Sequence, residues 1–197
     1  LVNSIRLRPG PYDDDLRRHA PVNPANLPAA ASAPAADLES RLVYDACAPA
    51  CARLYRDAKP DQAAYRVISA APGRCELSCD DTVKTYVLDG NSLLCEYAWQ
   101  APVASRLGME WVFNLLAAEA PDRGLLYAGR RYPLSWAGAL PAGVLTLCDG
   151  WRRLHVELQA PGAAGWRVRP RHSVSQSEEG FEAVYQGTAI RADWAAG

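Results

Sequence analysis

The chain has 197 residues, of which 49% are hydrophobic and 22% charged, and its formal net charge at pH 7 is -1. A chain of this size can bury a substantial core, and a near-zero charge argues against partners such as nucleic acid or an anionic membrane surface. No apolar run reaches the roughly 18 residues of a membrane-spanning helix. The first ten residues are too charged for a signal peptide, so we expect a cytoplasmic protein.

Residues 1–36 are rich in proline and alanine and show no apolar period. This composition predicts an irregular, semi-extended linker. Asp13, Asp14 and Asp15 could suggest a cation site, but consecutive acidic side chains point in different directions, so a solvated helix start is the better interpretation. The chain begins at Leu1, not at methionine, and we expect it to be a C-terminal piece of a longer protein. The expected domain covers residues 37–197.

Residues 37–58 form the most helix-like segment of the sequence. Asp37 is a plausible N-cap, and Leu38 and Leu42 share one helical face. Pro49 prevents a long helix. We therefore expect one short helix in this segment.

From Tyr65 onward the pattern is that of short strands separated by turns. Pro72-Gly73, Asp80-Asp81 and Asp89-Gly90-Asn91 are turn signals, and Asp-Gly between apolar runs is a strong hairpin signal. Such spacing predicts an all-β fold, an antiparallel β-sandwich. The expected strands cover residues 65–69, 74–78, 83–88, 92–99, 107–117, 143–147, 154–159, 165–168 and 181–190.

Residues 172–190 are dense in polar groups that alternate with apolar ones. Ser173, Ser175 and Ser177 form a row with period two, and the alternation resumes after Glu179-Gly180. This pattern predicts two extended segments joined by a turn at Glu179-Gly180. Ser175-x-x-Glu178 also fits a helix capping box, which is the alternative for this stretch.

The segment from Ser175 to Gly187, Ser-Gln-Ser-Glu-Glu-Gly-Phe-Glu-Ala-Val-Tyr-Gln-Gly, resembles the C-terminal signature of the family 57 glycoside hydrolases of the 4-α-glucanotransferase and α-amylase type. Looser matches occur in the same order at residues 41–45, 83–87, 108–115 and 145–149. The resemblance implies a supersandwich like that of galactose mutarotase, placed after a catalytic (β/α)7 barrel. It also implies that the catalytic carboxylates lie in that barrel, so this chain would carry no catalytic pair.

The chain departs from the family pattern near its start. Where relatives have Tyr-Asp-Arg, this sequence has Tyr44-Asp45-Ala46, and Leu54-Tyr55 stands where we place an Asp-His pair. This chain therefore lacks the arginine and the Asp-His pair of the family pattern at these positions.

Several polar and aromatic residues are candidates for contacts with substrate or with the barrel. The tryptophans at 136 and 151 lie beside glycines in expected loops, where an exposed ring could stack on a sugar, whereas Trp111 lies among apolar residues and should be buried. The candidate residues are Ser175, Gln176, Ser177, Glu178, Glu182, Tyr185, Gln186, Glu110, Trp136 and Trp151.

The six cysteines are expected to be reduced, because the chain is long and shows no secretion signal. Two pairs have Cys-x3-Cys spacing, which fits zinc less well than Cys-x2-Cys, so we expect no metal and no cofactor.

The expected function is a non-catalytic accessory domain that supports an N-terminal catalytic barrel and holds α-1,4-glucan. One alternative is a free-standing mutarotase-like sugar epimerase, with His155 or His172 and Glu178 as acid and base. Another is a carbohydrate-binding or interaction module with an unknown partner.

Overall fold

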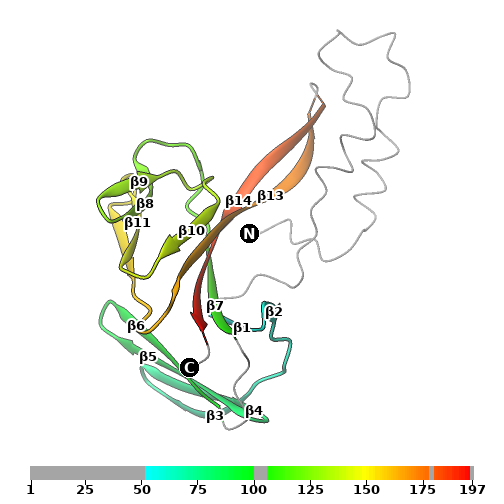
Figure 1. Ribbon diagram of the computed structural model, residues 1–197, viewed down its shortest axis with the longest axis vertical. Helices are drawn as coiled ribbons and strands as arrows, with labels where there is room; N and C mark the ends of the chain where they lie inside the picture. Colours follow the sequence, from blue (N-terminus) through cyan, green and yellow to red (C-terminus); the bar gives the residue numbers. More distant parts are fainter. Residues whose placement is uncertain (1–51, 100–105, 178–179, 196–197) are drawn as a thin grey trace, which may run out of the picture.

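The computed structural model describes residues 52–99, 106–177 and 180–195, and in these residues every regular element is a β-strand (Figure 1). The strands form three antiparallel sheets. The six-stranded sheet has the order β10 (Gly138–Pro141), β13 (Gly165–Ser177), β14 (Gly180–Ala195), β7 (Arg106–Phe113), β1 (Arg53–Arg56) and β2 (Lys59–Pro60). The second sheet has the order β12 (Leu154–Leu158), β11 (Leu145–Asp149), β8 (Arg123–Tyr127) and β9 (Arg130–Tyr132). The third has the order β3 (Arg66–Ala71), β4 (Arg74–Cys79), β5 (Thr82–Asp89) and β6 (Ser92–Trp99).

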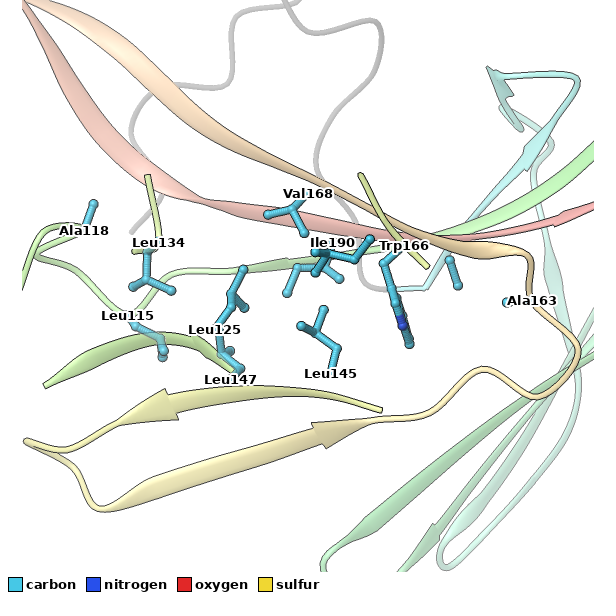
Figure 2. Close-up of a cluster of buried hydrophobic side chains, with 12 residues drawn as sticks. Leu115, Ala118, Leu125, Leu134, Leu145, Leu147, Ala163, Trp166, Val168 and Ile190 are labelled. Carbon is cyan, nitrogen blue, oxygen red and sulfur yellow. The ribbon is translucent and has the colours of Figure 1, made fainter. Parts of the chain in front are cut away.

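The first two sheets pack face to face and enclose the main core. Leu125 and Leu145 of the second sheet lie against Trp166, Val168 and Ile190 of the six-stranded sheet, and each of the five is at most 2% exposed (Figure 2). Along β13 and β14 these residues alternate with exposed or half-buried arginines, as expected for strands with one buried face. The all-β sandwich predicted from the sequence is confirmed.

The third sheet is a meander of tight hairpins that leaves large apolar side chains in solvent. Its turns follow the predicted signals: Gly90 adopts a φ of 54° between the paired residues Asp89 and Ser92. Val67, Leu88 and Leu93 are 62%, 59% and 53% exposed. This sheet is joined to the six-stranded sheet where Arg56 of β1 meets Asp81 before β5.

The structure corrects some expected boundaries. Residues 53–56, expected as helix, form β1, while residues 37–51 lie outside the described part. The strand expected at 107–117 ends at Phe113, because Leu116 and Ala117 adopt positive φ angles that do not fit an extended strand. The strands β1, β2, β8, β9 and β10 were not predicted. The expected linker at residues 1–36 also lies outside the described residues.

The hairpin of β13 and β14 forms a long ribbon that projects from the sandwich (Figure 1). It contains the two extended segments predicted at residues 172–190, and the capping-box alternative is wrong because Ser175 lies in a strand. Ser177 pairs with Gly180, so Gly180, expected in the turn, is the first residue of β14, and residues 178–179 lie outside the described part. In the described residues, no helix is long and apolar enough to cross a bilayer.

Candidate functional site

The outer part of the β13–β14 hairpin, residues 172–177 and 180–187, is called the arm below. β10 pairs with β13 only up to Val168, and β7 pairs with β14 only from Thr188 onward. Beyond these points, among the described residues, the two strands pair only with each other. A shift in register between Arg171 and His172 marks the place where the ribbon leaves the sheet, because such an irregularity bends a strand and increases its twist.

The sequence candidates Ser175, Gln176 and Ser177 lie on β13 of the arm, and Glu182 lies opposite Ser175 on β14. Glu182 is exposed. Glu178 lies outside the described residues. The structure therefore places the polar motif at the projecting end of the ribbon, away from the sandwich core.

Tyr185 and Gln186 lie nearer the base of the arm, where their side chains bind neighbouring strand residues. The Gln186 side-chain amide donates to the Ser173 hydroxyl at 2.9 Å. The Thr188 hydroxyl donates to the Leu134 carbonyl at 2.8 Å, so Tyr185, whose hydroxyl lies 2.6 Å from Thr188, donates to Thr188. Burial raises the pKa of Tyr185 and keeps its hydroxyl protonated as the donor. Tyr185 thus ties the ribbon to the sandwich through Thr188 and Leu134, and Gln186 links the two strands of the arm.

A buried ionic cluster lies at the base of the arm and contains Glu110. The Glu110 carboxylate, in a residue 6% exposed, accepts a hydrogen bond from the Tyr55 hydroxyl at 3.0 Å. It also accepts one at 3.4 Å from the guanidinium of Arg171, which is 8% exposed. The cluster therefore joins β1, β7 and β13, and it fixes the ribbon just before the register shift.

Small residues on the intervening strand leave room for this cluster. β14 lies between β13 and β7, and it has Gly187 opposite Arg171 and the buried Ala189 two residues further on. A Cβ on Gly187 would lie 2.9 Å from the Phe113 carbonyl oxygen, so a larger residue would also push β14 away from β7.

Arg191 extends the cluster along β14. Its Nε lies 2.7 Å from the Asp193 carboxylate, and its guanidinium lies over the Tyr55 ring at 4.7 Å from the ring centre. Arg191 and Glu110 are direct partners across β14 and β7. Tyr55 is thus held by an anion at its hydroxyl and by a cation at its ring face.

Sequence reasoning missed Tyr55, Arg171 and Arg191 as members of this cluster. A signal for part of it was present, because arginines alternate with apolar residues at 167–171, which indicates a charged face opposite the core face. Tyr55 carried no such signal, since it lies 55 residues from Glu110 in the sequence.

The two candidate tryptophans occupy different environments. Trp136 is half-buried: its ring centre lies 4.6 Å from that of Tyr132, and its ring fills the space beside Gly138. Trp151, in the turn between β11 and β12, is 79% exposed. Trp111, expected to be buried, is only half-buried on β7.

The histidines and cysteines do not form a metal centre in the described part of the chain. His155 on β12 and His172 on the arm are both exposed, and β12 and β13 belong to different sheets. No disulfide joins the four cysteines that the structure describes, Cys75, Cys79, Cys95 and Cys148. Cys47 and Cys51 lie outside the described residues.

Comparisons with known proteins identify the family. Residues 76–197 match the family described as "Alpha-amylase/4-alpha-glucanotransferase, C-terminal", so the match starts within β4 and includes the arm and Glu110. Alpha-amylase 1 of Dictyoglomus thermophilum is 35% identical over 94 residues, which are 46% of this chain and 13% of that relative. No solved structure matched the chain. Because the family match spans more than half of the sequence, this chain belongs to the family of C-terminal domains of alpha-amylases and 4-alpha-glucanotransferases.

Proposed function

We propose that this chain is a non-catalytic accessory domain of an enzyme that cleaves or transfers α-1,4-glucosidic bonds, and that its arm docks onto the catalytic domain. Family membership supports the type of enzyme. The observation that carries the docking role is the arm itself. It extends the polar motif away from the sandwich (Figure 1), and the cluster of Tyr55, Glu110 and Arg171 anchors its base.

The environment of Glu110 supports a structural role for this carboxylate. Glycoside hydrolysis needs one carboxyl group that donates a proton and a second that acts as base or nucleophile. Glu110 is buried and already binds the Tyr55 hydroxyl and the Arg171 guanidinium, so neither role suits it. The catalytic pair belongs, in this proposal, to the catalytic domain of the longer polypeptide, in the manner of the family 57 enzymes.

The arm is suited to docking because its chemistry is polar and its base is fixed. An interface formed by hydroxyl, amide and carboxylate groups gains specificity when the groups are held in place before binding. At the base of the arm, side chains are held in place by the hydrogen bond from Gln186 to Ser173. The two hydrogen bonds from Tyr185 to Thr188 and from Thr188 to Leu134 add to this support.

The proposal is tested by titrating the separately produced catalytic domain with this chain in a calorimeter. Glu182→Lys reverses an exposed charge on the arm, and Glu157→Lys reverses an exposed charge on β12 as the matched control. We expect Glu182→Lys to weaken binding at least about tenfold, which corresponds to about 1.4 kcal/mol, and Glu157→Lys to leave it unchanged. Equal effects of the two changes, or no binding by the folded chain, would contradict the docking role.

A further inference from the structure

The turn between β11 and β12 holds an exposed tryptophan, Trp151, that is not part of the arm. Trp151 is 79% exposed, whereas Trp166 is 2% exposed and Trp136 and Trp194 pack against the main core. An exposed tryptophan offers a large flat apolar face and a polar N–H, a combination that suits contact with a ligand that is apolar on one side and polar at its edge.

The backbone that carries Trp151 is fixed on both sides. Asp149, directly before the turn, is fully buried; its carboxylate accepts a hydrogen bond from the Arg152 amide at 3.1 Å and lies 3.3 Å from Nε of Arg123. Burial alone would raise the pKa of Asp149, but the Arg152 amide and the guanidinium groups of Arg123 and Arg152 outweigh it and lower this pKa, so the carboxylate stays charged.

The neighbouring loop completes the support. The Gly150 amide donates to the Asp122 carbonyl at 2.8 Å, and a Cβ on Gly150 would lie 3.0 Å from that residue. The two loops are therefore in close contact, and Trp151 is presented on an ordered turn. A backbone that is fixed before binding loses little conformational freedom when a ligand binds to the turn.

The chemistry around Trp151 favours a sugar. An indole face matches the apolar face of a pyranose ring, and the adjacent Arg152, with its side chain 50% exposed, supplies donors for sugar hydroxyls. The sequence neighbours of Trp151 are Gly150, Arg152 and Arg153, none of which is a large apolar residue. Trp151 and these neighbours therefore do not form the wide apolar surface that is typical of the centre of a protein interface.

We propose that Trp151 and Arg152 form a surface site that binds an α-1,4-linked glucan chain, with a pyranose stacked on the indole and its hydroxyls bound by the guanidinium. The identity of the glucan rests on the proposed function. In the longer enzyme the site would hold the polymer close to the catalytic domain without taking part in the reaction.

The test is a calorimetric titration of the full chain with maltoheptaose, with cellohexaose as the control for linkage. We expect saturable binding of maltoheptaose that Trp151→Ala weakens at least about tenfold and that Trp151→Phe, which keeps a flat ring, largely retains. Leu154→Ala, at a 40% exposed apolar position on β12, is the matched control and should not change the affinity.

Three outcomes would overturn the site: no binding of maltoheptaose by the folded chain, equal binding of cellohexaose, or binding that Trp151→Ala leaves intact. The same variant also separates this proposal from the docking role. Trp151→Ala should bind the catalytic domain as the unchanged chain does, and a loss of that binding would show that Trp151 contacts protein instead of sugar. If Glu182→Lys binds the catalytic domain as tightly as Glu157→Lys does, docking by the arm is wrong. That result would not change the expected binding of maltoheptaose at Trp151.

Discussion

Replacing Glu110 by glutamine tests whether the buried cluster stabilises the base of the arm. The glutamine keeps an acceptor for the Tyr55 hydroxyl but removes the negative charge that faces the guanidinium of Arg171, which is only 8% exposed. At the observed separation of 3.4 Å and an effective dielectric constant of about 20, the attraction between two unit charges is about 5 kcal/mol. Because the charges are spread over both groups, we expect a loss of about 3 kcal/mol, the lower end of the range for breaking a buried ion pair.

The assay is urea unfolding followed by tryptophan fluorescence, to which the buried Trp166 contributes, with Glu76→Gln as the matched control. Arg74 and Glu76 approach to 2.7 Å, closer than the buried pair, but their side chains are 51% and 27% exposed. We expect a loss below about 1 kcal/mol for the control, because solvent screens an exposed pair. Burial, and not the distance between the charges, should decide the difference in stability loss between the two variants.

A double-mutant cycle completes this test. Arg171→Met alone should also destabilise the chain, since it leaves the Glu110 carboxylate in a buried position, and the double variant should lose about 2 kcal/mol less than the sum of the single losses. Equal losses for Glu110→Gln and Glu76→Gln, or additive single effects in the cycle, would refute the reasoning.

Three further predictions concern the core, the ribbon and the loop that carries Trp151. Leu125→Ala, at a fully buried position, should cost about 3 to 5 kcal/mol of unfolding free energy, whereas Leu88→Ala, at a position 59% exposed, should cost less than about 0.5, and equal costs would contradict the described core. Gly187→Ala should cost about 1 to 3 kcal/mol, because Gly187 has a φ of 154° and the added Cβ would meet the Phe113 carbonyl oxygen; unchanged urea unfolding would contradict this geometry. The native pKa of Asp149 lies below its ordinary value of about 3.9, so Asp149 stabilises the fold above that pH and the contribution is lost as the pH falls through the lower native value. The difference in melting temperature between the chain and Asp149→Asn should therefore shrink below about pH 4, and a difference that grew there would reverse the assigned sign.

The elements that could be predicted from the sequence are those with local signals. The hairpin at Gly90 needed only a turn residue between two apolar runs, and the ribbon at residues 172–190 needed only its period of two. By contrast, β1 was taken for part of a helix. Leu38 and Leu42 have helical spacing, but Tyr55 belongs to a strand because it pairs with Gly108 more than fifty residues away.

The candidate site was predicted only in part for the same reason. Glu110 was chosen for its chemical type, yet its burial depends on Tyr55 and Arg171, which lie 55 and 61 residues away in the sequence. Trp136 and Trp151 gave the same signal, a tryptophan close to a glycine in a loop. Packing on Tyr132 and Gly138 buries part of the Trp136 side chain, and no sequence pattern distinguishes it from Trp151.

Hydrogen exchange of the chain, alone and with the catalytic domain, tests the docking role of the arm most directly. The account predicts slower exchange at the amides of residues 172–177 and 180–187 when the catalytic domain is present, because those backbone groups become covered. Amides of β12, which carries the control residue Glu157, should exchange at an unchanged rate. Slower exchange confined to the third sheet, where Val67, Leu88 and Leu93 are exposed, would contradict the account and assign docking to that sheet instead.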